Sequence, residues 1–570
     1  MRICASGVMP MVSVRITAAR ADCGEPLPFA HRYEWGEMEH RWSWYIATMT
    51  MAVVRLREDL PAGATLEVEA EYQERKMRGE RETGRPSPQQ SRDRYSGLTW
   101  RLHALAVADV DAEQGEPVAA PFEVRFVAGE PARLAAWLRH DGRLLVRRFD
   151  RAGNPAATQA AAGRATAHGS AGRVAVREGA GLTAVSNALP RALDGTPIFF
   201  GEFHWHTEFS GDGQRPTVDA LRSARDELAL DFAGPSDHLS PAGTYRSSGV
   251  EGTVTRTVAE QAALCRPFEE PGRFCAAPAA ELSRRYGHAN LYAESWDLLE
   301  EITARFAAEL APAWERKNDR YDLASLLRLC PPGRALVVPH HSNMDSYVRE
   351  GVREDGRPAW CAMHWPLPAD RDVVRLVEMV QQRGCFEAEE TDERWRIWDG
   401  GLGGSVRTAL ARGYRLGFVG GTDNHSGWPT RMGDGYCGLT AIQAPVLAWD
   451  ELFRALYARR CYATTGARIV ADVTLNGAAM GSELRLEPGD ERRLRVMIRG
   501  TAPLACVQVV HCGHVLADLP VAAGSEDLDA EWVDERPGRP LQDVYYYVRA
   551  RQRDGECLWT SPFWVDLIED

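Results

Sequence analysis

Four apolar segments in the middle of the chain each run directly into histidines and acidic residues, and this repeated feature restricts the fold strongly. The segments begin near residues 199, 231, 337 and 418. When parallel strands form a barrel, their carboxyl ends converge on one mouth, where side chains distant in the sequence share a pocket. The polar pairs that follow the four segments are His204 with His206, Asp237 with His238, His340 with His341, and Asp423 with His425.

The wider segment 195–467 alternates short apolar runs with amphipathic stretches. Strands are expected at 230–234, 335–339, 384–388 and 416–421, and helices at 217–228, 291–310, 370–382 and 449–460. Strands that alternate with helices of this length predict a mainly parallel sheet or a barrel.

The spacing of the polar residues indicates metal binding. Side chains alternate along a strand with a period of two, so His204 and His206 lie on one face and can grip the same ion. Asp423 and His425 repeat this spacing with a carboxylate in place of one imidazole. Mixed nitrogen and oxygen ligands suit zinc, manganese or iron better than calcium or magnesium.

Each of these pairs also has an ordinary structural explanation. An Asp-His pair at a strand end is commonly a cap or a surface pair, and Asp423-Asn-His425 can form an Asx turn. One metal site accounts for all four pairs at matching strand ends, whereas the structural explanations need a separate reason for each pair. Glu281 and His288 add further ligand types in a stretch expected to be a loop, where a carboxylate could bridge two metals.

The regions on either side are predicted to be β structure. Residues 66–72 and 122–127 alternate apolar and charged residues, so 1–128 is expected to be a β-rich domain. A small β-sandwich-like module is expected at 129–194 and a C-terminal β-sandwich at 468–570, which together flank an α/β domain at 195–467.

Composition and charge exclude several functions. The chain of 570 residues is 44% hydrophobic and 26% charged, which is typical of a globular protein with several domains. Its net charge of −13 argues against nucleic acid or an anionic membrane as partner. There is no run of about 18 uncharged apolar residues, the length that a transmembrane helix needs. We expect a small-molecule substrate and leave the oligomeric state open.

The cysteines and the first residues bear on the compartment. The 12 cysteines are scattered and include no Cys-x-x-Cys pair, which disfavours a structural thiolate zinc site. The first residues show no apolar run typical of a secretory signal. Scattered cysteines without such a signal predict reduced thiols and a cytoplasmic location.

Several motifs resemble those of the PHP (polymerase and histidinol phosphatase) metallohydrolases. The segment Gly201-Glu-Phe-His-Trp-His-Thr-x-x-Ser-x-Asp-Gly213 resembles the opening motif, and Ser236-Asp-His238, Pro339-His and Gly421-Thr-Asp-x-His425 resemble later ones in the same order. Closer still, residues 195–570 resemble the uncharacterised PHP-type family called domain of unknown function 3604. The matching stretches are Gly287-His-Ala-Asn-Leu-Tyr, His340-x-Ser-Asn, Arg459-Arg-Cys-Tyr-Ala-Thr-Thr-Gly-Ala-Arg-Ile and Trp559-Thr-Ser-Pro-Phe-Trp-Val.

The resemblance implies a distorted β/α barrel of seven strands that holds two or three divalent metals, zinc or manganese, with iron as an alternative. Asp212 stands where many relatives carry histidine, and His341 stands where the closer relatives carry asparagine. The implied ligands are His204, His206, Glu281 and Asp423 for one metal, Glu281, His288 and His340 for a second, and Asp212, His238 and His425 for a third position.

These ligands predict a hydrolase that uses a metal-activated water as its nucleophile. Asp237 could orient that water or carry a proton, and its alternative role is to support His238. His341, as the neighbour of His340, is the second candidate catalytic residue. Four arginines flank the motifs and could neutralise a phosphate, although loop arginines are commonly just solvated. They are Arg246, Arg284, Arg285 and Arg431.

Three functions remain open from the sequence. Phosphoester hydrolysis is the commonest activity among PHP relatives and is the first hypothesis. The second is hydrolysis of a carbamate, a carboxylic ester or an amide, because some PHP-type proteins that resemble this chain cleave aryl carbamates. The third is a non-catalytic metal-binding protein with a degenerate barrel. Substrate panels separate the first two, and metal analysis tests the third.

Overall fold

The computed structural model describes the chain in segments. It describes seven short strands between residues 2 and 125 and, after them, residues 133–149, 164–168, 171–178, 182–210, 213, 216–240, 242–249, 252–284, 287–315, 327–343, 365, 371–388, 404–425, 438–536 and 541–568.

The chain divides into two compact units. One comprises Met1–Leu134, Arg147–Ala161 and Ser248–Val254, and the other comprises Ala135–Val146, Ala162–Ser247 and Thr255–Asp570. The four domains expected from the sequence, and the three boundaries between them, stay predictions.

The unit that begins at Met1 contains two small antiparallel sheets. Their strand orders are β1-β2-β5-β6 and β3-β4-β7. The alternating pattern at 66–72 correctly predicts β5, and that at 122–127 predicts β7. The bounds are β1 Arg2–Ile3, β2 Met11–Ala18, β3 Phe29–Ala30, β4 Val53–Leu56, β5 Leu66–Gln73, β6 Trp100–His103 and β7 Glu123–Arg125.

The other unit is organised around one long mixed sheet. Its strand order is β17-β14-β13-β24-β25-β34-β33-β30-β31, with β28 and β35 also paired to it. Strand β14 is parallel to both β13 and β17, whereas β24 pairs antiparallel with β13 and β25. The bounds are β13 Ile198–Glu202, β14 Phe232–Ala233, β17 Cys275–Ala276, β24 Leu439–Gln443, β25 Cys461–Thr464, β28 Glu483–Leu486, β30 Leu504–His511, β31 His514–Leu519, β33 Leu541–Gln552, β34 Cys557–Thr560 and β35 Phe563–Leu567.

Smaller sheets complete this unit. The orders β18-β19-β20 and β22-β21-β23 carry residues of the candidate site, and β10-β11-β12 forms a separate sheet. Strands β8, β9, β15 and β16 each have residues in both units. The bounds are β8 Arg133–Leu138, β9 Leu144–Phe149, β10 Arg164–His168, β11 Arg173–Glu178, β12 Leu182–Val185, β15 Tyr245–Gly249, β16 Gly252–Arg256, β18 Ala279–Arg284, β19 Gly287–Ala293, β20 Ala335–His340, β21 Leu376–Gln381, β22 Gly384–Cys385 and β23 Gly417–Gly420.

Two of the four predicted helices are confirmed closely. The helical segments are α4 Thr217–Arg222 with η1 Ser223–Glu227, α5 Val258–Cys265, η2 Arg266–Phe268, α6 Trp296–Glu315, α8 Val406–Ala411 and α9 Trp449–Tyr457. The helix expected at 291–310 begins later, because its first residues belong to β19. Within the described part of the chain, no helix combines the length and the apolar character needed to cross a bilayer.

The helix predicted at 370–382 is wrong. Residues Leu376–Gln381 form β21, which pairs in parallel with β23 and antiparallel with β22. Every residue of β21 is buried, so its apolar run faces protein on both sides. A short apolar run of this kind fits a buried strand and a buried helix equally well by periodicity alone.

The described strands do not close into the expected seven-stranded barrel, and the fold is mixed α/β. Strands β18, β19 and β20 pair antiparallel instead of in parallel. Strand β18 ends at Arg284 and β19 begins at Gly287. A link this short makes a hairpin, whereas a parallel pair needs a crossover of a dozen or more residues. The stretch around Glu281, expected to be a loop, is therefore a β-hairpin.

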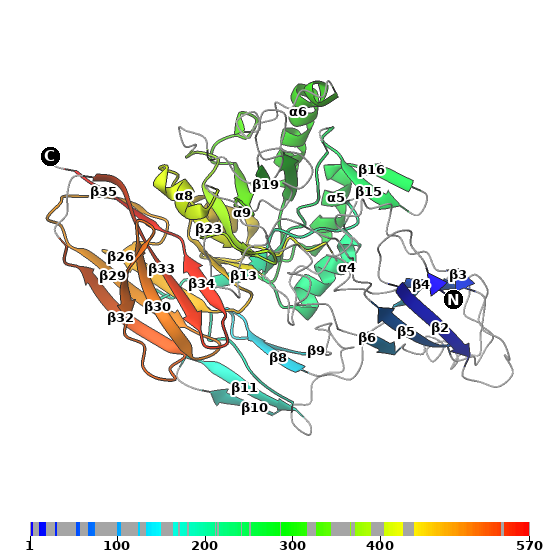
Figure 1. Ribbon diagram of the computed structural model, residues 1–570, viewed down its shortest axis with the longest axis horizontal. Coiled ribbons are helices and arrows are strands. Elements are labelled where there is room, and N and C mark those ends of the chain that lie inside the picture. The colour runs from blue at the N-terminus through cyan, green and yellow to red at the C-terminus, as the bar shows by residue number, and fades with distance from the viewer. Residues whose placement is uncertain are drawn as a thin grey trace, which may run out of the picture. The chain divides into compact units, whose positions relative to one another are not determined.

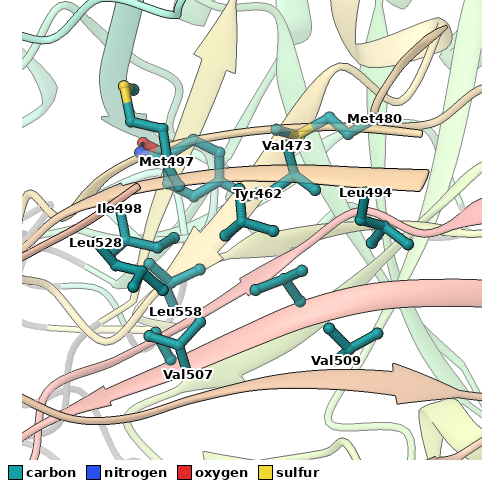
Figure 2. Close-up of a cluster of buried hydrophobic side chains, with 14 of the residues drawn as sticks. Tyr462, Val473, Met480, Leu494, Met497, Ile498, Val507, Val509, Leu528 and Leu558 are labelled. Atoms are coloured by element: carbon teal, nitrogen blue, oxygen red, sulfur yellow. Dashed lines mark hydrogen bonds between the residues drawn. The ribbon is translucent and has the colours of Figure 1, made fainter. Parts of the chain in front are cut away.

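Two sheets pack face to face in the C-terminal part of the chain. One has the order β27-β26-β29-β32 and the other is the end of the long sheet that contains β30 and β33; Figure 1 shows these strands together in orange and red. Figure 2 shows their core, in which Val473 and Ile498 of the first sheet face Val507 of the second. The remaining bounds are β26 Val470–Leu475, β27 Ala478–Ala479, β29 Arg492–Arg499 and β32 Asp527–Asp534.

Candidate metal centre

Backbone pairing brings the first two ligand pairs together. The segment after β13 runs beside the segment after β23, where Asp423 N donates to His204 O at 2.6 Å and His206 N donates to Asn424 O at 2.8 Å. Asp423 has a φ of 53°, a left-handed conformation that aspartate tolerates better than most residues. The register therefore places residues more than two hundred positions apart side by side.

His204, His206, Glu281 and Asp423 form the first candidate metal-binding group. Their ligand atoms all lie within 4.8 Å of one another, and all four side chains are buried. Asp423 Oδ1 lies 3.3 Å from His206 Nε2 and 3.6 Å from His204 Nε2. These are the four residues that the sequence resemblance implies for one metal.

A second group consists of His288, His340 and His341, whose ligand atoms also lie within 4.8 Å of one another. His288 and His340 are directly opposite each other in the β19–β20 register. His341 follows with a φ of 32° and is buried beside them. The group thus includes His341, which the sequence reasoning treated as a neighbour of the ligands.

Glu281 lies between the two groups. Its Oε1 is 3.0 Å from His288 Nδ1 and 3.3 Å from His340 Nε2. Its Oε2 is 3.1 Å from His206 Nε2 and 3.3 Å from His238 Nδ1. Each oxygen therefore faces a different set of imidazoles, which is the arrangement of a carboxylate that bridges two cations.

His206, His238 and His425 form a third group. The His206 ring stacks on both others, with centroids 4.4 Å from His238 and 4.1 Å from His425. His238 is the most open of the three, with its side chain 25% exposed. Asp212, which was expected to contribute to this position, lies outside the described residues.

A buried carboxylate that sequence reasoning missed orients His204. Glu378 of β21 lies with Oε2 2.7 Å from His204 Nδ1. An imidazole that donates its Nδ1 proton to a carboxylate has its Nε2 lone pair available for a metal. Burial lowers the pKa of His204, but Glu378 and Glu281 outweigh it and raise that pKa to about 9. The second proton then sits on Nε2, where a metal would replace it.

A hydroxyl orients His206 in a similar way. Ser210 Oγ donates to Asp237 Oδ1 at 2.9 Å, so it can only accept from His206 Nδ1, which lies 3.0 Å away. That bond fixes the tautomer whose Nε2 faces Glu281 and Asp423.

Asp237 takes part in a dense set of hydrogen bonds instead of facing the ligand atoms. Besides Ser210, its carboxylate accepts from Thr207 N at 2.6 Å, from Thr207 Oγ1 at 2.7 Å and from Gln261 Nε2 at 2.6 Å. These bonds fix the loop that follows His206. Through Ser210, Asp237 supports His206. Its expected roles, to orient the water or carry a proton or else to support His238, stay predictions.

Three consecutive side chains, at the end of β21 and in the turn after it, contact Asp423. Gln381 Nε2 donates to Asp423 Oδ2 at 3.0 Å, Gln382 Nε2 donates to the backbone oxygen of Asp423, and the Arg383 guanidinium forms an ion pair with Oδ2. Gln381 and Gln382 lie in the segment predicted to be a helix, and Arg383 directly follows it. The available signal was a Gln-Gln-Arg-Gly turn directly after an apolar run.

The protonation and hydrogen bonding of the candidate ligand histidines fit divalent metals. Burial and the charge of His204 lower the pKa of His340 well below its usual value, and burial together with His340 does the same for His341. Neutral imidazoles are the form that binds metal. His204 Nε2 and both ring nitrogens of His340 are buried without a hydrogen-bonding partner, which is costly unless a ligand satisfies them.

The described structure does not test the four predicted substrate-binding arginines. Arg246 and Arg284 lie in β15 and β18, and the structure describes their backbone only. Arg285 and Arg431 lie outside the described residues. Their role stays a prediction.

No known family model matches the chain. An uncharacterised protein of Chlamydia muridarum is 32% identical over 219 residues, covering 34% of this chain and 35% of that protein. Uncharacterised proteins of Chlamydia trachomatis serovar D and Chlamydia pneumoniae are 31% identical over 220 residues and 37% identical over 182 residues, covering 35% and 29% of their lengths. The chain therefore spans about a third of the curated relatives that it matches.

One solved structure is similar at low level. It is the crystal structure of a two-domain protein containing a predicted PHP-like metal-dependent phosphoesterase from Bacteroides vulgatus ATCC 8482, with a TM-score of 0.31 and 14% identity over 66% of this chain and 97% of that one. A likeness this weak does not establish a common fold, and the identification of the site rests on its own geometry.

Proposed function

We propose that this chain is a metal-dependent hydrolase whose centre holds at least two divalent metals and whose most favoured substrate is a phosphoester. The observation that carries the proposal is Glu281, whose two oxygens face separate groups of buried histidines. A structural role for one carboxylate does not require five imidazoles around it. The motif resemblance to PHP metallohydrolases, including the uncharacterised family 3604, supports the same assignment.

Divalent metals in such a centre lower the pKa of a bound water towards neutrality and polarise the electrophile. The residues of the chain prepare the centre for that role. Glu378 and Ser210 fix the tautomers of His204 and His206, and Gln381 holds one oxygen of Asp423. The mixture of imidazole and carboxylate favours zinc or manganese, with iron as the alternative. We further propose a small-molecule substrate and a cytoplasmic location.

A phosphoester is favoured over the other substrates by charge. The carboxylates of Glu281, Glu378, Asp423 and Asp237 carry no more negative charge than two divalent ions carry positive charge, and Arg383 adds another cation beside them. A metal-loaded centre is therefore positive, and it stabilises a substrate whose reacting group is already anionic.

The proposal is tested with the metal-replete full chain. A panel of nitrophenyl phosphomonoesters and phosphodiesters is assayed with manganese and with zinc, together with nitrophenyl acetate and an aryl carbamate. We expect phosphoester turnover that is lost in Asp423→Ala and His340→Ala. His514→Ala, which removes an exposed histidine of β31, serves as the matched control and keeps full activity.

The outcomes separate the alternatives. Turnover of the ester or carbamate alone contradicts the phosphoester assignment and leaves a hydrolase. Less than one equivalent of metal in the purified, metal-incubated chain contradicts the metal centre itself and favours a non-catalytic protein.

A further inference from the structure

A buried arginine stands against the candidate metal centre, outside every residue that the sequence motifs point to. Arg383 is 1% exposed and lies in the turn between β21 and β22. A buried guanidinium is costly unless it is paired and hydrogen-bonded. Its position beside ligand atoms, instead of in an ion-pair network on the surface, requires an explanation.

The contacts of Arg383 tie it to the centre. Its Nη1 forms an ion pair with Asp423 Oδ2 and donates to Gln381 Oε1 at 2.9 Å. The other oxygen of Asp423 faces His204 and His206. Asp423 thus divides its carboxylate between the first metal group and the guanidinium.

Arg383 also lies near the second group. Its positive charge is one of the causes that lower the pKa of His288, after burial, and of His341, after burial and the neighbouring histidines. The cation contacts the first group through Asp423 and acts on the second group through its charge. Any group that spans the two candidate metal positions comes within its electrostatic reach.

We propose that Arg383 is the anion-binding residue of the centre and that it holds a non-bridging oxygen of a phosphate group on the substrate. This inference rests on the proposed function and names the substrate feature that the site recognises. The planar guanidinium fork matches phosphate oxygens in two parallel hydrogen bonds, which a lysine cannot reproduce. Gln381 holds the fork in place, and Asp423 neutralises it in the absence of substrate.

The test measures binding of inorganic phosphate to the manganese-loaded full chain by calorimetry, with metal content determined for every sample. The variants are Arg383→Met, Arg383→Lys and, as the matched control, Arg371→Met, which removes a half-exposed arginine paired with Asp543. We expect the Kd for phosphate to weaken by about tenfold or more in Arg383→Met and to recover in part in Arg383→Lys. Arg371→Met binds phosphate like the unchanged chain.

Unchanged phosphate affinity in Arg383→Met with full metal content overturns the inference. If Arg383→Met fails to retain metal, Arg383→Lys decides: weaker phosphate binding with full metal supports the role, and unchanged binding overturns it. A second arm uses acetate, and a stronger dependence on Arg383 for acetate than for phosphate contradicts the phosphate assignment. Phosphate binding that depends on Arg383 in a chain that hydrolyses no phosphoester refutes the proposed function but keeps this inference.

Discussion

At the scale of single residues, the centre consists of ligand histidines and the acceptors that orient them. His204 depends on Glu378, and His206 depends on Ser210, which in turn is fixed by Asp237. Each acceptor is buried, so its replacement leaves an imidazole free to choose the wrong tautomer. Supporting groups of this kind are as important for metal affinity as the ligands themselves.

We predict that Glu378→Ala lowers metal affinity by about 10–100-fold, because His204 loses the carboxylate that fixes its Nδ1 proton. Glu378→Gln retains an acceptor and is expected to lose less. Metal competition with a chromogenic chelator measures both. Glu309→Ala, an exposed glutamate on α6, is the control, and equal affinity in Glu378→Ala and this control contradicts the role.

The position of Glu281 predicts how many metal ions each ligand variant retains. Glu281→Ala should reduce metal binding at both groups, because its oxygens lie within 3.3 Å of ligand nitrogens in each. Asp423→Ala should affect mainly the first group, since Asp423 Oδ2 lies 3.9 Å from His341 Nε2, and His340→Ala should affect the second. Elemental analysis after dialysis gives the number of ions retained. Loss of a single ion in Glu281→Ala, with the second fully retained, would falsify the bridging role.

At the scale of elements, strand β21 and the segment that follows β23 hold the residues of the candidate centre together. Strand β21 carries Glu378 and leads into the turn that surrounds Asp423, and it pairs in parallel with β23, which precedes Asp423. Gly421, directly after β23, packs against both His204 and Glu378. A side chain at this position has no space to enter.

We therefore predict that Gly421→Ala disrupts the metal centre. An added Cβ would lie 2.6 Å from His204 Cβ and would also overlap Glu378 Oε2. Neither neighbour can move without breaking the His204–Glu378 bond, so metal retention should fall together with activity. Gly489→Ala, at an exposed turn where a Cβ meets no atom within 4 Å, is the control. Full metal content in Gly421→Ala contradicts this packing.

The Tyr-Ala-Thr-Thr-Gly-Ala-Arg stretch has a structural role at this scale. Arg468 is buried and donates to Leu228 O at 2.6 Å and to Ala229 O at 3.0 Å, where the helical segment α4–η1 ends. Tyr462 OH donates to Ile469 O at 2.9 Å and holds the turn that carries Arg468. The motif thus fixes a helix end to the C-terminal part of the chain.

Arg468→Ala is expected to destabilise the fold by about 1–3 kcal/mol, because two buried carbonyl groups lose a charged donor. Urea unfolding followed by circular dichroism measures the change in the free energy of unfolding. Metal binding by the folded chain should be unchanged. A shift no larger than that of Arg454→Ala, an exposed arginine on α9, would refute the capping role.

At the scale of the whole molecule, the segment that carries the candidate metal centre and the C-terminal strands share one sheet. Strand β25, which ends before residue 468, pairs with β34 near the end of the chain. Glu387, after β22, accepts from Trp559 Nε1 at 3.0 Å and from Arg549 Nη1 at 2.9 Å. The predicted boundary between 467 and 468 is therefore a boundary in sequence composition that a continuous sheet crosses.

A chain that ends at residue 467 should not fold on its own. The shortened chain lacks β34, so β25 would become an unpaired edge strand of the long sheet. Exposed edge strands promote aggregation. Size-exclusion chromatography and circular dichroism of the shortened chain provide the measurement. A monomeric, cooperatively folded 1–467 chain that retains metal would contradict this expectation.

The sequence by itself predicted the four polar pairs of the candidate centre, because each pair follows an apolar run whose strand character is a local property. It also predicted the helices that begin at Thr217 and Trp449. It could not show Glu378, Gln381 or Arg383, since a short buried run has the same pattern in a strand as in a helix. Only the tertiary structure decided that Glu281 lies in a hairpin between two histidine groups, because which oxygen faces which imidazole depends on strand register and not on spacing along the chain.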